Sequence, residues 1–536
     1  MTYKKKYLPL IIGITLALGF WGGGLFHFDS TTDLFVTSLK KQKLSKLIDY
    51  IDNEYVDDVN TDSIVDVTVN KILEGLDPHS VYIPKKNISD ITESMNGNFV
   101  GIGVSFYLRK DTISVIKIIP GGPSENSGLA SGDKILLADK DTLYGEGITN
   151  KKVVDKLKGE INSKVKLTLY RASEDRFFSV VVSRGSVPIK SVPISYMIND
   201  DLGFIKINRF AETTYQEFVL ELKKLKSKGM KSLILDLRGN PGGFLERAQQ
   251  IVDEFLEKDR LILFTKNKKG DVQNFYATDN GEFEKGEVFV LQDEESASAS
   301  EIVAGALQDN DKGTIVGRRS FGKGLVQREM QLGDGSVVRL TVSRYYTPTG
   351  RSIQKPYKTL SDDDYYNEYR NRYISGELID SSQIEVADSL KFVTPKGKIV
   401  YGGGGIIPDV FVSIGEDKDF EKLYYAINSN LMSNFVFFLL EKDRVYYNSL
   451  TKKDLVDNYK ISEDVIEEFK RNIKPFLRGE LSYEENTYDN QIKRAIRSEM
   501  ASQLFNDNLA YQIKDVDDRM VQKVIEILNT KVHDKK

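Results

Sequence analysis

The stretch Ser232-Leu-Ile-Leu-Asp-Leu-Arg-Gly-Asn-Pro-Gly-Gly243 decides the fold class of this chain. Its first six residues are mostly large and aliphatic, which is the pattern of a strand buried on both faces of a sheet. The next six are mostly polar residues, proline and glycine, and they predict a tight turn. A helix is expected to follow from Phe244 to about Glu257. A strand, a turn and a helix form the repeating unit of α/β folds, so an α/β domain is predicted here.

The alternation of strands and helices continues on both sides of this stretch. Further strands are predicted at Gly203–Asn208, Glu287–Leu291, Gly313–Gly317 and Ser336–Val342, and further helices at Thr214–Lys228 and Ala299–Asp309. We therefore expect one α/β domain over residues 186–412.

Residues 96–185 show a different pattern, in which short strands are separated by glycines. The predicted strands are Phe99–Phe106, Ile113–Ile119, Lys134–Ala138, Lys166–Tyr170 and Phe178–Val182, and the predicted short helices are Pro123–Leu129 and Asn150–Leu157. This composition indicates a small β-rich domain.

The loop formed by Gly101, Ile102, Gly103 and Val104 resembles the carboxylate-binding loop of PDZ domains. The segment Pro123–Asp133 resembles the segment that adjoins this loop in the PDZ domains of proteases. Backbone N–H groups of such a loop capture a C-terminal carboxylate while the peptide adds as a strand to the sheet edge. The resemblance implies a PDZ domain whose partners are protein substrates with exposed, apolar C-termini.

A charge-free segment lies close behind a basic cluster at the start of the sequence. Lys4, Lys5 and Lys6 precede residues 7–28, which are uncharged and long enough to span a bilayer as a helix. The segment is longer than the apolar region of a cleaved signal peptide, and no small-x-small site follows it. We expect a transmembrane signal anchor over residues 1–28, with the lysines in the cytoplasm.

Two helical regions flank the PDZ-like and α/β domains. Apolar residues at helical spacing predict a small helical domain over residues 29–95. Residues 413–536 are highly charged and mainly helical in pattern, with no catalytic motif. We expect this C-terminal extension to be a solvated appendage rather than a docking module.

The composition excludes several classes of chemistry. The 536 residues include 75 basic and 79 acidic side chains, which are well mixed and give a formal net charge of −4. No basic surface for nucleic acid is therefore expected. There is no cysteine, which removes disulfides, thiolate nucleophiles and cysteine metal ligands. Among only three histidines, His79 alone lies well inside the chain, and we expect it to be a hydrogen-bonded structural residue.

Candidate nucleophiles occur in Glu295-Ser-Ala-Ser-Ala-Ser-Glu301, where a predicted helix begins. A serine there lies at the positive end of a helix dipole, and spare N–H groups can receive a developing oxyanion. Ser298 and Glu301 also have the spacing of a capping box, so a purely structural role stays open. Spacing does not choose among Ser296, Ser298 and Ser300.

A serine hydroxyl needs a base within hydrogen-bond reach to become a nucleophile. Because histidine is so scarce, the best candidate is a neutral lysine. Its pKa would have to fall by roughly 3 units from about 10.4, and burial can produce such a shift. Lys323 in Phe321-Gly-Lys-Gly-Leu-Val326 has the small and apolar neighbours that burial requires.

Three motifs together resemble the C-terminal processing peptidase, or tail-specific protease, family. They are Leu235–Gly243, Ser296–Ile302 and Phe321–Gln327, preceded by the PDZ-like domain, and the resemblance covers roughly residues 76–409. It implies a multidomain α/β protein with a crotonase-like, or Clp-like, protease core. The PDZ domain is inserted, and helical regions lie at both ends.

The same resemblance implies the site residues. Ser298 would be the nucleophile and Lys323 the base, and Gln327, one helical turn later, would orient the lysine. The oxyanion hole would use the backbone N–H of Ala299 and that of Gly242 or Gly243. No metal and no organic cofactor is implied. With the anchor, the resemblance implies a bacterial inner-membrane protein whose catalytic body lies on the periplasmic side.

Three alternatives can be set against this hypothesis. A catalytically degenerate PDZ scaffold would lack a nucleophile, base or orienting residue, and all three are present. A Ser-His hydrolase would need His79 beside Ser298. A phosphate-binding loop matches the glycine and lysine spacing of Gly317–Lys323, but Gly324 stands where serine or threonine must hold magnesium.

Overall fold

A computed structural model of the chain describes residues 39–109, 111–357, 365–415, 418–476 and 488–534. The chain divides into two units, residues 1–76 and 77–536. The smaller unit contains α2 (Leu39–Glu54) and α3 (Thr61–Glu74), where helical periodicity predicted helices. The predicted anchor over residues 1–28 lies outside the described residues. Within the described ranges, no helix is both long and apolar enough to cross a membrane.

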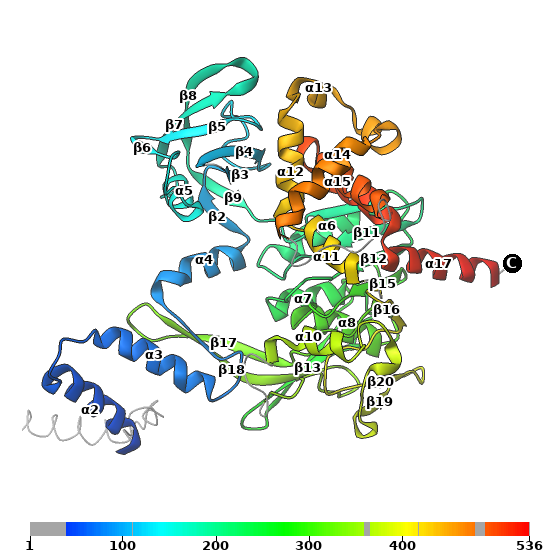
Figure 1. Cartoon of the computed structure of the whole chain (residues 1–536). Helices are drawn as coiled ribbons and strands as arrows, with labels where there is room; N and C mark the ends of the chain where they lie inside the picture. The colour runs from blue at the N-terminus through cyan, green and yellow to red at the C-terminus, as the bar shows by residue number, and fades with distance from the viewer. Residues whose placement is uncertain (1–38, 110, 358–364, 416–417, 477–487, 535–536) are drawn as a thin grey trace, which may run out of the picture. The chain divides into compact units, whose positions relative to one another are not determined.

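The centre of the larger unit is a six-stranded sheet with the order β10-β11-β12-β15-β16-β21 (Figure 1). β10 is antiparallel to β11, and the other neighbours are parallel, as the strand and helix alternation predicted. The strands are β10 (Ile194–Met197), β11 (Leu202–Lys206), β12 (Ser232–Asp236), β15 (Glu287–Gln292), β16 (Gly313–Gly317) and β21 (Val410–Phe411). Helices α6 (Thr214–Ser227), α7 (Leu245–Asp253) and α8 (Ala299–Asp309) pack on this sheet in the largest apolar core.

The carboxyl ends of three adjacent parallel strands carry the motifs that the sequence singled out. β12 leads into the turn 237–243, β15 into the loop 293–298, and β16 into the loop 318–324. Parallel strands place their carboxyl ends at one sheet edge, which is where α/β proteins build ligand sites. The register therefore gathers the three motifs although up to 80 residues separate them.

A second, antiparallel sheet contains β1 (Val81–Ile83), β13 (Leu261–Asn267), β14 (Val272–Tyr276), β17 (Leu325–Gln331) and β18 (Val337–Tyr346). Because β1 pairs with β18, residues 77–95 belong to the larger unit, and they continue into α4 (Lys85–Asn96). The helical domain predicted over residues 29–95 therefore ends at Leu76.

The β-rich domain has its own sheet and core. Its elements are β2 (Asn98–Gly101), β3 (Val104–Arg109), β4 (Thr112–Ile118), β5 (Lys134–Ala138), β6 (Asp141–Thr142), α5 (Asn150–Leu157), β7 (Lys164–Arg171), β8 (Arg176–Ser183) and β9 (Gly185–Pro188). The helix predicted at Pro123–Leu129 is wrong, because this segment forms successive turns. Ser127 donates to the carbonyl of Ser124, a local bond that competes with helix formation.

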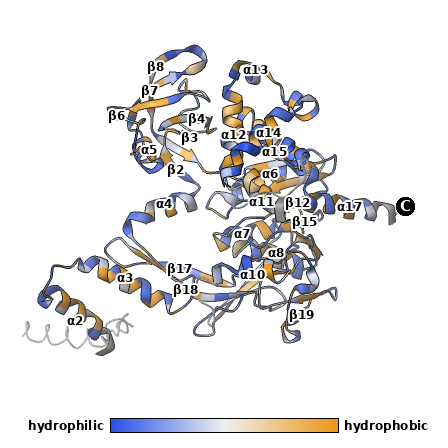
Figure 2. Cartoon of the chain, viewed as in Figure 1, coloured by the Kyte–Doolittle hydropathy of each residue, from blue (hydrophilic) through white to orange (hydrophobic). Residues whose placement is uncertain are grey.

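The C-terminal extension is not a solvated appendage. Its helices are α11 (Lys418–Ile427), α12 (Asn430–Glu441), α13 (Arg444–Ser449), α14 (Glu463–Ile473), α15 (Asp489–Leu504), α16 (Asp507–Lys514) and α17 (Arg519–Asp534). These helices enclose an apolar core of their own. Helix α12, which is largely orange in Figure 2, packs in this core with most of its apolar residues buried.

The last helix of the extension also packs on the central sheet. Met520, Val521 and Val524 of α17 are buried among apolar side chains of β10, β15 and β16. Nη1 of Arg238, in the turn after β12, donates to Oδ2 of Asp518 at 2.6 Å. Charged residues line the exposed faces of this helix, which is why its sequence suggested a solvated segment. Separately, β19 (Lys391–Val393) and β20 (Ile399–Tyr401) form a short antiparallel hairpin.

Candidate active site

Ser298 occupies a strained turn between β15 and α8. Its backbone has φ 55° and ψ −111°, and α8 begins at the next residue. A non-glycine residue adopts such a conformation only where surrounding structure enforces it, and such residues concentrate at functional sites. The turn holds Ser298 at the N-terminus of α8, as predicted.

The serines on either side of Ser298, Ser296 and Ser300, are both buried and hydrogen-bonded. The hydroxyl of Ser296 donates to the carbonyl of Leu237 at 2.8 Å, and that of Ser300 donates to the carbonyl of Asn240 at 2.9 Å. These bonds join the segment that carries Ser298 to the turn that follows β12.

The two candidate oxyanion glycines differ in their surroundings. The N–H of Gly242 donates to Oδ1 of Asn240 at 2.9 Å. Gly243 is exposed, and within the described ranges neither its N–H nor that of Ala299 has a hydrogen-bond acceptor. A β-carbon on Gly242 would lie 2.8 Å from Cβ of Ser298 and 2.9 Å from N of Ala299, so only glycine fits there.

Glu301 is hydrogen-bonded to the backbones of both Ser298 and Lys323. Its buried carboxylate accepts from the backbone N–H of Ser298 and of Lys323, both at 2.8 Å and both through Oε2. Oε1 accepts from the N–H of Gly322 at 2.7 Å and from the hydroxyl of Ser320 at 2.6 Å. Burial raises the pKa of Glu301, and these four donors oppose the rise. One carboxylate therefore fixes the relative positions of the two backbones.

Tyr345 also bonds to the backbones of Ser298 and Lys323, in this case to their carbonyl groups. Its hydroxyl donates toward the carbonyl of Lys323 at 2.8 Å and that of Ser298 at 3.2 Å. The side chain is 1% exposed and belongs to the largest core. Ser298 and Lys323 are thus held together by a buried acid and a buried phenol, although no hydrogen bond joins Oγ of Ser298 to Nζ of Lys323 among the described residues.

Lys323 has the environment that a neutral lysine requires. Burial lowers its pKa to about 8, and repulsion from Arg339 contributes in the same direction. Attraction to Glu301 and to Asp77 opposes the shift. At pH 7 about a tenth of the molecules then hold a neutral lysine, a useful fraction for a general base.

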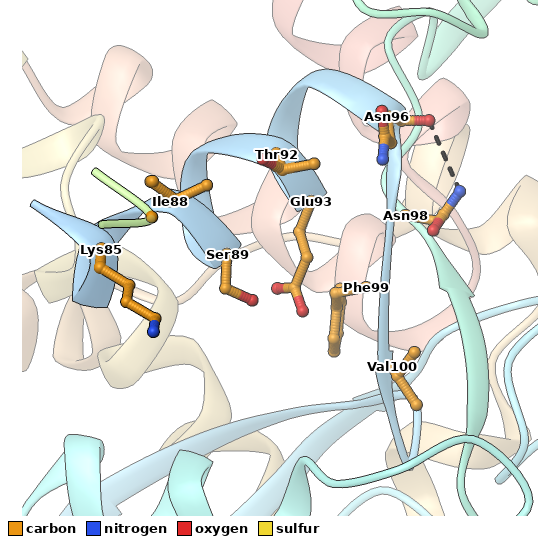
Figure 3. Close-up of a pocket in the computed structure, with 10 residues that line it drawn as sticks. Lys85, Ile88, Ser89, Thr92, Glu93, Asn96, Asn98, Phe99 and Val100 are labelled. Carbon is orange, nitrogen blue, oxygen red and sulfur yellow. Dashed lines mark hydrogen bonds between the residues drawn. The ribbon is translucent and has the colours of Figure 1, made fainter. Parts of the chain in front are cut away.

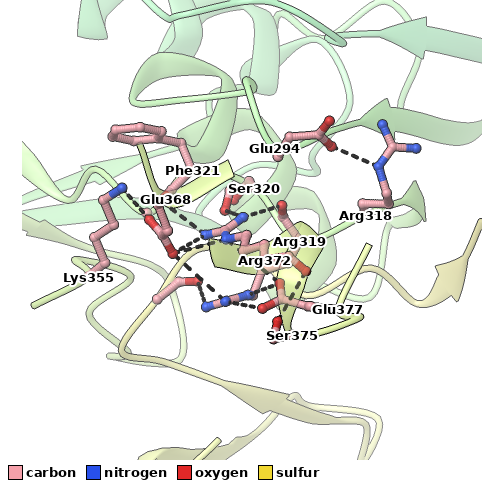
Figure 4. A network of polar contacts seen from close by, with 12 residues as sticks. Glu294, Arg318, Arg319, Ser320, Phe321, Lys355, Glu368, Arg372, Ser375 and Glu377 are labelled. Atoms are coloured by element: carbon pink, nitrogen blue, oxygen red, sulfur yellow. Dashed lines mark hydrogen bonds and ion pairs between the residues drawn. The ribbon is translucent and has the colours of Figure 1, made fainter. Parts of the chain in front are cut away.

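Helix α10 (Glu368–Ile374) clamps the loop that carries Lys323. Nη1 of Arg372 donates to the carbonyls of Arg319 and Ser320, each at 2.9 Å. Figure 4 shows Arg372 and Glu377 gathered around this loop, where Nε of Arg319 donates to Glu377 at 2.6 Å. The lysine loop therefore depends on residues more than 45 positions away.

Gln327 lies on strand β17, so the expectation that it follows Lys323 by one helical turn is wrong. The chain between them is extended because β17 pairs along its whole length with β18. Nε2 of Gln327 donates to Oγ1 of its cross-strand partner Thr341 at 3.3 Å. Within the described residues no hydrogen bond joins Gln327 to Lys323.

His79 lies beside the lysine rather than the serine. Its Nε2 is 2.9 Å from the hydroxyl of Tyr365, in agreement with a hydrogen-bonded structural residue. Burial lowers the pKa of His79 to about 3, and the charge of Lys323 adds to the effect. The imidazole is therefore neutral at physiological pH.

A groove beside the loop of Gly101, Ile102, Gly103 and Val104 forms a second candidate site. This cavity of about 330 Å³ has an apolar floor that includes Phe106 and residues of α5, whereas α4 contributes Asp90, Glu93 and Ser94. The N–H groups of Ile102 and Gly103 have no acceptor within the described ranges.

The carboxylate of Glu93 lines this groove beside Lys158. Nζ of Lys158 donates to Glu93 at 2.6 Å. Figure 3 shows Glu93 of α4 pointing toward Phe99, where a neighbouring cavity of about 420 Å³ shares both residues. The groove thus offers free backbone donors, an apolar floor and one lysine.

Sequence reasoning missed several residues that surround the candidate pair Ser298 and Lys323. The capping-box spacing pointed to Glu301, but only its bond to the N–H of Ser298 was implied, and not its bonds to the lysine loop. Tyr345, Arg372 and Asp77 carry no motif of their own. Their signal lies in tertiary contacts between distant segments.

Comparisons with known proteins identify families for two parts of the chain. Residues 201–362 match the model of peptidase family S41, and residues 100–182 match that of the PDZ domain. The carboxy-terminal-processing protease of Bartonella bacilliformis is 33% identical over 316 residues, which cover 58% of this chain and 72% of that protein. The carboxy-terminal processing protease CtpB of Bacillus subtilis is 31% identical over 332 residues, or 61% and 68% of the two chains.

A solved structure, that of the photosystem II D1 C-terminal processing protease, aligns with 70% of this chain and 88% of its own. The identity is 23% and the TM-score is 0.37. The PDZ match covers the β-rich domain that contains the groove. With its PDZ domain and its S41 peptidase domain, the chain belongs to the carboxy-terminal processing protease family of serine-type peptidases.

Proposed function

We propose that this peptidase captures the free C-terminus of a protein substrate in its PDZ groove and cleaves the substrate's C-terminal region through Ser298 and Lys323. The observation that carries the proposal is the Glu301 carboxylate, one oxygen of which accepts from the backbone N–H of both residues. Burial gives Lys323 a pKa of about 8, as a base acting near neutral pH requires.

The chemistry follows acyl transfer. Neutral Lys323 removes the hydroxyl proton of Ser298, whose Oγ attacks the carbonyl carbon of the scissile bond. The lysine gives this proton to the leaving amine as the C–N bond breaks, which leaves an ester on Ser298. Lys323 then takes a proton from water, hydroxide adds to the ester, and the lysine gives this proton to Oγ of Ser298 as the bond between Oγ and the acyl carbon breaks. The product is a carboxylic acid, which loses its proton to solvent.

The oxyanion formed in both steps needs fixed N–H donors. We assign one of these donors to the backbone N–H of Ala299, the residue directly after Ser298. The surroundings of the glycine pair favour Gly243 over Gly242 as the other, because the N–H of Gly242 is already bonded to Asn240. Gln327 is proposed to hold Lys323 through its side-chain oxygen.

The PDZ groove is proposed to select the substrate. Free N–H groups at Ile102 and Gly103 suit a terminal carboxylate, and the apolar floor suits an apolar last side chain. We also propose that the protease core has a crotonase-like, or Clp-like, fold, and that residues 1–28 anchor the chain in a bacterial inner membrane with the catalytic body on the periplasmic side. Protease treatment of intact spheroplasts tests that orientation, because only an externally placed body would be digested.

The test of the function uses the full chain and an unfolded protein substrate with an apolar C-terminal tail. The wild type should cleave it, whereas Ser298→Ala and Lys323→Ala should be inactive. Amidation of the substrate's C-terminus removes only the carboxylate and should lower kcat/KM by about tenfold or more. Full activity in either variant would contradict the Ser-Lys mechanism, and equal cleavage of the amidated substrate would contradict tail recognition.

A further inference from the structure

The side chain of Gln327 has two chemically different ends, and its neighbours decide which end faces the lysine. An amide offers two N–H donors at one end and an oxygen acceptor at the other. Gln327 on β17 is the cross-strand partner of Thr341 on β18. Its Nε2 lies 3.3 Å from Oγ1 of Thr341.

The hydroxyl of Thr341 fixes this arrangement because it has only one hydrogen. That hydrogen is donated to Oδ1 of Asp77 at 3.0 Å. Oγ1 can then only accept from Gln327, so the amide must present its N–H₂ group to Thr341. The Oε1 atom is left to accept from another donor, and a lysine ammonium is such a donor.

Asp77 is itself immobilised. Its carboxylate, in a residue 7% exposed, accepts from the N–H of His79 at 2.9 Å and from the N–H and hydroxyl of Ser80 at 3.0 and 2.7 Å. The hydroxyl of Ser80 in turn accepts from the N–H of Thr341 at 3.1 Å. Each of these partners, like the hydroxyl of Thr341, donates a hydrogen bond to the Asp77 carboxylate.

The cluster is close enough to Lys323 to act on it. The charged groups that bear on the lysine are Asp77 and Glu301, which are acidic, and Arg339, which is basic. Neutral His79 lies on the same side and is bonded through its N–H to Asp77. Asp77 therefore acts on Lys323 through its charge, and it is also bonded to Thr341, the cross-strand partner of Gln327.

We propose that Asp77 and Thr341 are positioning residues that orient the Gln327 side chain so that its oxygen faces Lys323. This inference rests on the proposed Ser-Lys mechanism and extends it to residues in β18 and in the segment before β1. Neither residue is proposed to touch substrate. Their effect is on the geometry and the charge of the base.

Thr341→Val and Thr341→Ser in the full chain test the orientation. Valine keeps the shape but removes the hydroxyl, so Gln327 is free to turn, and kcat should fall about 100-fold with KM little changed. Serine keeps the hydroxyl, so the kcat of Thr341→Ser should stay within about threefold of the wild-type value. An unchanged kcat in Thr341→Val, or an equal loss in folded Thr341→Ser, would overturn the proposal.

Asp77→Asn supplies a readout that a merely structural role would not give. Removal of the negative charge should move the acid limb of the pH–rate profile to lower pH. Loosening of the site would admit water to Lys323 and move the limb toward the ordinary lysine value instead. A limb that stays in place or moves to higher pH therefore contradicts the role of Asp77.

Wild type and Lys323→Ala in the same assay separate failure of the positioning role from failure of the Ser-Lys function. If the wild type is inactive, or if Lys323→Ala is active, the Ser-Lys function itself fails. If both behave as expected while Thr341→Val matches the wild type, only the positioning role fails. Thermal unfolding of each variant establishes that the folded protein is being compared.

Discussion

The turn that carries Ser298 and the loop that carries Lys323 are built in different ways. The turn is held by residues of adjacent parallel strands and by the start of α8, through backbone and short side-chain contacts such as those of Asn240 and Ser296. The lysine loop is held and tuned by side chains from remote segments, including Arg372, Tyr345 and Asp77.

This difference separates geometry from electrostatics. A strand, a strained turn and a helix N-terminus suffice to expose a serine hydroxyl near free N–H groups. A lysine becomes a base only when burial and neighbouring charges lower its pKa, and those conditions require the whole domain. Glu301 and Tyr345 each bond to both regions, the acid through backbone N–H groups and the phenol through backbone carbonyls.

Glu301→Gln should lower both activity and stability, because it disturbs both regions together. The glutamine N–H₂ group would face donors that now bond to a carboxylate. We expect kcat to fall by about 10³-fold and the free energy of unfolding by about 3 kcal/mol. Protein cleavage and urea unfolding measure the two effects. Glu246→Gln, at an exposed glutamate in the first turn of α7, is the matched control and should behave like the wild type.

Gly242→Ala should damage the serine turn while leaving the lysine environment intact. The new methyl group would lie 2.8 Å from Cβ of Ser298, at a φ of 100°. We expect a loss in kcat of about 100-fold, with the pH–rate limb unmoved. Gly239→Ala is the control, because its φ is also positive but its β-carbon would meet only a side chain at 3.6 Å. Equal losses in the two variants would show that strain, and not crowding of the nucleophile, matters.

Lys323→Met should abolish cleavage and yet stabilise the fold. The folded-state pKa of Lys323 lies below its unfolded value, so the charged form destabilises the native state. This penalty is complete below about pH 8 and disappears as the pH rises toward the unfolded value near 10.5. We expect a gain on the order of 2 kcal/mol at pH 7, measured by urea unfolding. Lys285→Met, at an exposed lysine, should show no comparable gain.

Arg339→Gln should give the smallest effect and concerns only the lysine. Repulsion from Arg339 lowers the pKa of Lys323, so its removal should raise that pKa. The acid limb should move up by about half a pH unit, with a loss of about threefold at pH 7 and little loss above the limb. Arg344→Gln lies on the same strand and is the control. A limb that moves downward, or moves equally in both variants, would contradict this origin of the shift.

Much of the fold could be predicted because its signals are local. The run from Ser232 to Gly243 identified a buried strand and its turn, and the structure confirms β12 and the strands beside it. Failures occurred where remote pairing decided the outcome. Gln327 lies on a strand because β18 pairs with it, and residues 77–83 leave the helical region because β1 joins the same sheet.

By itself the sequence determined the chemical inventory: no cysteine, one internal histidine, and serine and lysine in motifs after buried strands. Family resemblance chose Ser298 among three serines and supplied the role of Gln327. Only the tertiary structure decided what surrounds Lys323, because burial and charge are sums over neighbours from many segments. The same holds for the contacts of Glu301 and Asp77, which bond to atoms that no local pattern could bring together.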